Sequence, residues 1–102
     1  MRLNKRLAKK ILGEVDEERR FFVDDGRILS SLKNLWTAVD VMDEGCFRHH
    51  VNKEKNDFST WIRECLGDVR LADGLIGLDK NASLKKIGAR ITYIDRYLDK
   101  KL

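Results

Sequence analysis

The sequence predicts a mainly α fold, a compact bundle of about five or six helices with one short β-hairpin near residues 20–30. Three observations predict it. The 102 residues contain no proline, a residue that breaks helix interiors and is common in irregular loops. Apolar residues recur every three or four positions over most of the chain, which is the helical period. One Asp-Gly pair lies between two short apolar runs, as in a hairpin turn.

The chain length fits a single domain, residues 1–102, that supports one hydrophobic core. Within it, residues 1–13 predict a basic amphipathic helix. Leu3, Leu7 and Ile11 form an apolar stripe, basic side chains lie beside it, and Gly13 ends the helix. The next apolar runs, on either side of Asp24-Asp25-Gly26, predict the two strands of the hairpin. A hairpin alone is marginal in water, so we expect it to pack on the helices.

The remaining part of the segment 20–78 predicts four short helices, each opened by a side chain that can cap its N-terminus. The caps are Ser30 or Ser31, then Asp43, then Asn56 or Asp57, then Asp68. Gly67 and Gly77 end the last two helices. We expect the apolar residues at helical spacing to face inward: Leu32, Leu35, Trp36, Val39, Met42, Phe47, His50, Phe58, Trp61, Ile62, Cys65, Leu66, Leu71, Ala72, Leu75 and Ile76.

The longest predicted helix covers residues 82–100. Its apolar residues follow steps of three and four, which is a heptad seam of little more than two repeats. This seam packs either on its own domain or on a second chain. The second alternative makes it a partner interface, with a homodimer as one outcome, formed by Leu84, Ile87, Ile91, Ile94 and Leu98.

Charge is divided unevenly along the chain. Residues 1–12 hold five basic and no acidic residues, residues 80–102 hold seven basic and two acidic, and residues 13–79 hold nine basic and fifteen acidic. The basic ends form a solvated face, pair with the acidic middle, contact an anionic membrane surface, or bind phosphates of nucleic acid. Binding to phosphates would be salt-sensitive and would not depend on sequence. The candidate nucleic-acid-binding residues are Arg2, Lys5, Arg6, Lys9, Lys10, Lys85, Lys86 and Arg90.

The residues best suited to metal binding or proton transfer are Cys46, His49, His50 and Cys65. Cys46 and His50 are four residues apart, so they share one helix face and could hold a zinc ion. Both cysteines, however, occupy apolar positions, where a free thiol behaves as a small hydrophobic side chain. Since Phe47 and Val51 flank it, we expect His50 to be buried and bonded to Asn56 or Asp57, and we assign no metal.

No catalytic motif is present: the sequence lacks a phosphate loop, a nucleophile elbow, H-E-x-x-H and a dinucleotide fingerprint. We therefore expect no enzyme, no cofactor and no small-molecule substrate. No apolar stretch reaches the length of a membrane span, and Lys9 and Lys10 interrupt the N-terminal apolar residues. These patterns predict a cytoplasmic protein.

From Phe22 to about Leu78 the chain resembles a family of small uncharacterised archaeal proteins that has bacterial relatives. The resemblance rests mainly on the run N-D-F-x-x-W-I-R-x-x-x-G-D-x-x-L-A, which begins at Asn56. It is supported by Asp25-Gly26 and by His50-Val51-Asn52. It implies an archaeal-type origin and no activity. The basic first helix and the last helix lie outside the matched span.

From these patterns we expect a small, non-enzymatic binding module. Its favoured partner is nucleic acid or a ribonucleoprotein, contacted through the basic terminal helices. The alternative is a protein–protein or self-association module that uses the last helix.

Overall fold

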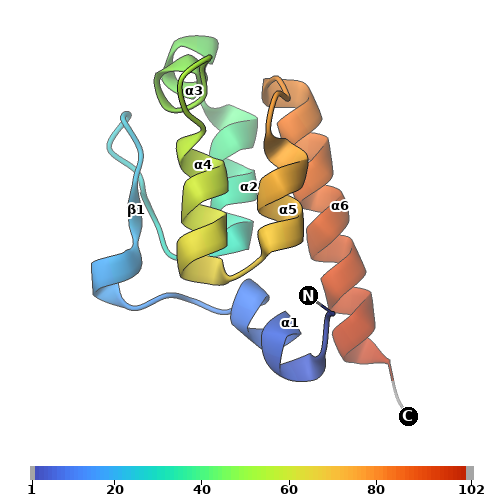
Figure 1. Cartoon of the computed structure of the whole chain (residues 1–102). Helices are drawn as coiled ribbons and strands as arrows, with labels where there is room; N and C mark the ends of the chain where they lie inside the picture. The colour runs from blue at the N-terminus through green and yellow to red at the C-terminus, as the bar shows by residue number, and fades with distance from the viewer. Residues whose placement is uncertain (1, 101–102) are drawn as a thin grey trace.

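The structure, a computed structural model, describes residues 2–100. Within this range the chain forms six α-helices and one two-stranded antiparallel hairpin, which confirms the predicted mainly α fold (Figure 1). The elements are α1 (Lys5–Leu12), η1 (Glu17–Arg19), β1 (Phe21–Phe22), β2 (Ile28–Leu29), α2 (Leu32–Val41), α3 (Glu44–His50), α4 (Asp57–Trp61), η2 (Ile62–Leu66), α5 (Val69–Leu75) and α6 (Lys80–Asp99).

Each α-helix begins at a residue whose side chain accepts a hydrogen bond from a backbone N–H of the first turn. These residues are Asn4, Ser31, Asp43, Asn56, Asp68 and Asp79. Such caps satisfy amide groups that have no partner inside the helix. The four predicted internal caps are therefore confirmed, with Ser31 and Asn56 as the residues used.

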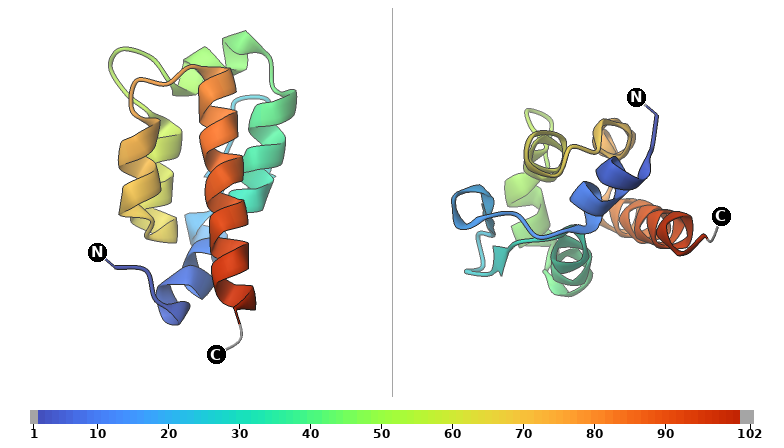
Figure 2. Two further views of the ribbon diagram at one scale, coloured as in Figure 1. Left: turned by 90° about the vertical axis from the view of Figure 1, so that its right-hand side faces the viewer. Right: turned by 90° about the horizontal axis from the view of Figure 1, so that it is seen from below.

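The long helix α6 is the centre of the packing, with α1, α2 and α5 against it. In Figure 2, α1 crosses the end of the bundle beside the C-terminal half of α6, while α3 lies at the opposite end. The core is mainly apolar, and the side chains of Ile11, Leu35, Ile62, Leu66 and Ile87 in it are inaccessible to solvent.

The hairpin lies on the side of the bundle away from α6 (Figure 1). Its register pairs Phe21 with Leu29 and Phe22 with Ile28, and Gly26 has a φ of 98°, which glycine adopts without strain. Phe21 packs against the rings of Phe58 and Trp61, with centroids 5.3 and 5.8 Å away. Phe22 and Ile28 point to solvent. The predicted packing of the hairpin on the helices is thus confirmed.

Two residues expected to face inward do not. Trp36 is 42% exposed and lies at the edge of α2, over Gly88 of α6. Ile76 is 60% exposed because α5 ends at Leu75 and the backbone continues in an extended conformation.

The segment between α4 and α5 also departs from the regular helix expected there. Residues Ile62–Leu66 form a π-helical turn, closed by a bond of 2.8 Å from the N–H of Gly67 to the carbonyl of Ile62. Gly67 then has a φ of 81°, as a residue that ends a helix often does. No helix among residues 2–100 has both the length and the apolar composition that crossing a membrane requires.

Candidate nucleic-acid interface

The basic side chains of the N-terminal segment all lie at the surface. α1 buries Ala8 and Ile11 against the bundle and leaves its other faces to solvent. The cations Arg2, Lys5, Arg6, Lys9 and Lys10 are exposed, and none of them forms an ion pair within the described residues.

On α6, the predicted candidates divide into two kinds. Lys85 and Lys86 are exposed and, within residues 2–100, have no ionic partner. Arg90 does not fit the prediction that it binds phosphate freely, because it is held by Asp68. Its Nε lies 2.8 Å from Asp68 Oδ2 and its Nη2 lies 3.1 Å from Oδ1. The side chains of the pair are only 16% and 2% exposed, so Arg90 is committed to its own fold.

The acidic middle of the chain pairs chiefly with its own cations. Arg19 pairs with Asp16, Arg27 with Asp25, Arg48 with Glu44, Lys55 with Asp57, and Arg63 with Asp73. The alternative that the basic ends are neutralised by the acidic middle therefore holds at one contact, Arg90 with Asp68. The contact between Lys33 and Asp95 has the opposite sense, because a cation of the middle pairs with an acid of the C-terminal helix. The other cations of the terminal helices form no ion pair within residues 2–100.

A shallow depression connects the two basic helices. One part is lined by Leu3 and Leu7 from the N-terminal segment, Arg70 from α5 and Arg90 from α6, together with the carboxylates of Asp68 and Asp73. The adjoining part is lined by the same two arginines together with Lys86 and Tyr93. The structure thus brings Lys86 and Arg90 of α6 and Arg70 of α5 beside the N-terminal segment. Lys10 of α1 lies next to Gly67, which lines the first part of the depression.

The heptad seam is not part of an external surface. Ile87 and Ile94 are fully buried, Ile91 is 9% exposed, and Leu84 and Leu98 pack against the same core. The partner interface predicted for these five residues is therefore corrected: the seam packs on its own domain because α1, α2 and α5 surround it.

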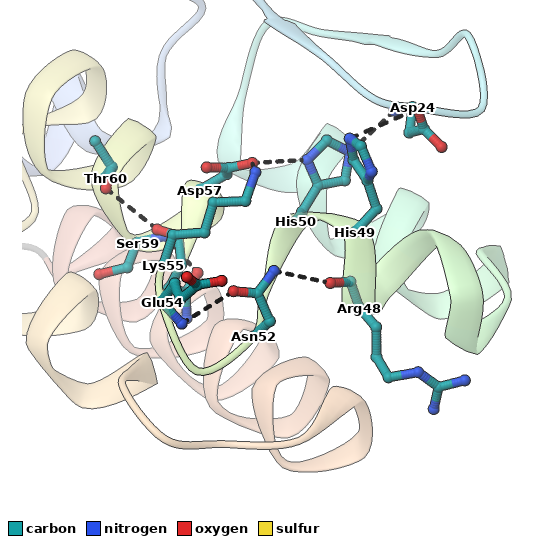
Figure 3. A network of polar contacts seen from close by, with 11 residues as sticks. Asp24, Arg48, His49, His50, Asn52, Glu54, Lys55, Asp57, Ser59 and Thr60 are labelled. Carbon is teal, nitrogen blue, oxygen red and sulfur yellow. Dashed lines mark hydrogen bonds and ion pairs between the residues drawn. The ribbon is translucent and has the colours of Figure 1, made fainter.

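His50 joins three separate segments of the chain (Figure 3). Its Nε2 accepts a hydrogen bond of 2.9 Å from the N–H of Asp24 in the hairpin turn. The ring proton must then lie on Nδ1, which is 3.0 Å from Asp57 Oδ2 at the start of α4. Both ring nitrogens are occupied within the fold and the ring is 5% exposed. The predicted burial and the bond to Asp57 are confirmed, and the arrangement is structural.

This arrangement of hydrogen bonds shifts the pKa of the Asp57 carboxyl group. Partial burial raises its pKa, but hydrogen bonds from Lys55 and His50 oppose that effect and hold the pKa below its ordinary value. A carboxylate that stays ionised keeps accepting both hydrogen bonds. His49, next to His50, is exposed instead and faces Asp24 with an N–O distance of 3.6 Å.

The two thiols are half-buried and free. Burial raises the pKa of Cys46 and of Cys65, so both remain protonated near neutral pH, which makes them poor nucleophiles. Within residues 2–100 no three His, Cys, Asp or Glu side chains gather in a geometry suited to a metal ion.

Sequence reasoning missed two residues of the connected surface, Arg70 and Tyr93. Arg70 shares α5 with Asp73, so the helix has no net charge and its one cation gave no signal. Tyr93 follows Arg90 by three residues on the outer face of α6, a spacing that brings the two side chains together on a helix. That spacing was the available signal.

Comparison of the chain with protein-family models, with curated proteins and with solved structures finds no match. The family resemblance carried by the motif at Asn56 stays a prediction.

Proposed function

We propose that this chain is a non-enzymatic binding module that contacts nucleic acid, free or within a ribonucleoprotein, through phosphate groups. The contacts come from the exposed cations of the two terminal helices: Arg2, Lys5, Arg6, Lys9, Lys10, Lys85 and Lys86. Arg90 is left out of the set because Asp68 holds it.

One observation carries the proposal. Among residues 2–100 these cations are exposed and form no ion pair, whereas the cations of the middle segment are largely paired with nearby carboxylates. Exposed like charges on neighbouring turns repel one another, so they cost stability in the free protein. A polyanion removes this repulsion and releases its own condensed counterions, which is the dominant source of sequence-independent affinity.

Salt titration tests the proposal. Fluorescence anisotropy with a labelled single strand and with a duplex, between about 50 and 200 mM salt, should show affinity that falls linearly on a log–log scale. Its slope counts phosphate contacts, at about 0.7 per contact for a single strand and about 0.9 for a duplex. Absence of binding to both probes at the lowest salt would overturn the proposal.

A matched pair of double variants locates the contacts. Arg6→Gln with Lys9→Gln removes two charges from α1, and we expect the single-strand slope to fall by about 1.4. Arg48→Gln with Lys53→Gln removes the same charges near α3, at the opposite end of the bundle (Figure 1), and should leave the slope nearly unchanged. Equal effects would mean that net charge, and not this surface, determines binding.

The alternative of self-association through the α6 seam has no support in the structure, since the seam residues lie in the core or pack against it. Light scattering over a concentration series measures the oligomeric state, and so tests self-association separately from nucleic-acid binding.

A further inference from the structure

Tyr93 is the exposed aromatic side chain on the proposed phosphate-binding surface. It is 57% exposed, and it lines a depression of about 360 Å³ between α5 and α6 with Arg70, Leu71, Lys86, Ala89 and Arg90. What sets this ring apart from the other exposed aromatic residues is its position, because cations border the depression that it lines.

The guanidinium group of Arg90 contacts the aromatic ring of Tyr93. Arg90 Cζ lies 5.6 Å from the ring centroid, within the range of a cation–π contact. Arg90 is in turn fixed by its two hydrogen bonds to the buried Asp68. The guanidinium therefore holds the ring in position at its inner side, while more than half of the side chain stays accessible from outside.

Two further cations border the same depression. Arg70 from α5 and Lys86 from α6 are exposed, and neither forms an ion pair in the described part of the chain. The depression continues toward α1, where Leu3 and Leu7 line its other end. A chain of phosphates that follows this path passes Lys86 and Arg70 and then Gly67, beside which Lys10 of α1 lies.

We propose that Tyr93 stacks on an unpaired base and that the ligand of this surface is single-stranded nucleic acid. The inference rests on the proposed function and specifies its substrate class. A duplex keeps its bases stacked inside, so it offers phosphates to the cations but no free base face to Tyr93. A single strand offers both, and base–aromatic stacking tolerates any sequence because every base has a π-face.

The test compares a single strand with a duplex of the same sequence by fluorescence anisotropy at fixed low salt. Tyr93→Ala should weaken single-strand binding about five- to hundredfold and change duplex binding less than about twofold. Tyr93→Phe and Tyr93→Trp retain the ring and should bind the single strand nearly as the wild type does. Because Tyr93 is exposed, we expect all three variants to keep the thermal stability of the wild type.

Phe22→Ala is the matched control, since Phe22 is an aromatic residue, 67% exposed, on the hairpin away from α6 (Figure 1). It should leave both affinities unchanged. If Tyr93→Ala has no effect, or weakens both ligands equally, the stacking role is overturned while phosphate binding stands. If neither ligand binds the wild type at low salt, the proposed function fails and the inference fails with it.

Discussion

Asp68 holds Arg90 across the interface between α5 and α6 and at the same time caps α5. One of its oxygens, Oδ1, accepts hydrogen bonds from the N–H of Leu71 at 3.2 Å and from Arg90 Nη2 at 3.1 Å. The other accepts a bond of 2.8 Å from Arg90 Nε. One buried carboxylate therefore fixes both the start of a helix and the guanidinium beneath Tyr93.

Asp68→Ala is expected to lower the free energy of unfolding by about 3–5 kcal/mol, because it leaves Arg90 without its partner in a largely buried position. Asp79→Ala removes another N-cap, that of α6, from an exposed residue outside the observed ion pairs, and should cost about 1 kcal/mol. Urea denaturation of both variants measures the difference. Equal losses would show that Asp68 acts only as a cap.

His50→Ala is expected to lower the free energy of unfolding by about 2–4 kcal/mol. It removes two hydrogen bonds that tie the hairpin and α4 to α3, and a ring that packs 5.2 Å from both Phe21 and Phe58. His49→Ala is the control, since its exposed side chain should change stability by no more than about 0.5 kcal/mol. Similar losses in both variants would contradict the structural role of His50.

The carboxyl group of Asp57 makes the free energy of unfolding depend on pH. Its pKa in the folded protein lies below the ordinary value of 3.8, so the unfolded chain binds the proton more readily. The stabilisation is therefore complete above the unfolded pKa and is lost as the pH falls through the lower folded pKa. Denaturation midpoints of wild type and Asp57→Asn, measured from neutral pH downward, should converge below pH 3.8. A constant difference between the two proteins across that range would refute this linkage.

Much of the fold could be predicted because its signals are local. The caps Asp43 and Asp68, the turn at Gly26 and the apolar stripe of α6 each depend on residues a few positions apart. Hydrophobic periodicity and side-chain capping act over that same distance, so the sequence displays them directly.

The features that were missed depend on contacts between distant segments. Arg90 is an ordinary cation of an exposed helix face until Asp68, 22 residues earlier, is folded beside it. Trp36 occupies a regular apolar position in α2, but Gly88 offers its indole a place at the edge of the bundle. The π-helical turn before Gly67 likewise has no local signature. Charge distribution identified the basic surface, whereas the position of Tyr93 on it required the packing of α5 against α6.

Gly88 lies under the indole of Trp36, in the middle of α6. A Cβ atom at this position would lie 2.8 Å from Trp36 Nε1, closer than side chains approach one another, so Gly88→Ala must displace the indole. Replacing glycine by alanine within a helix raises the free energy of unfolding by about 0.5–1 kcal/mol. The lost packing of Trp36 opposes that stabilisation. We expect a net change of unfolding free energy below about 1 kcal/mol, with red-shifted tryptophan emission and stronger quenching by iodide.

The control for this substitution is Gly74→Ala in α5, where the added Cβ meets only the flexible end of Lys86 at 3.1 Å. The Lys86 side chain can move aside, so alanine should still stabilise the helix. The tryptophan emission should stay unchanged. Trp61 reports little in either variant, because it is 6% exposed and its Nε1 donates to the carbonyl of Arg19 at 2.7 Å. An unchanged spectrum in Gly88→Ala would mean that α6 shifts away from α2 instead, and the loss of stability would then exceed the gain in helix propensity.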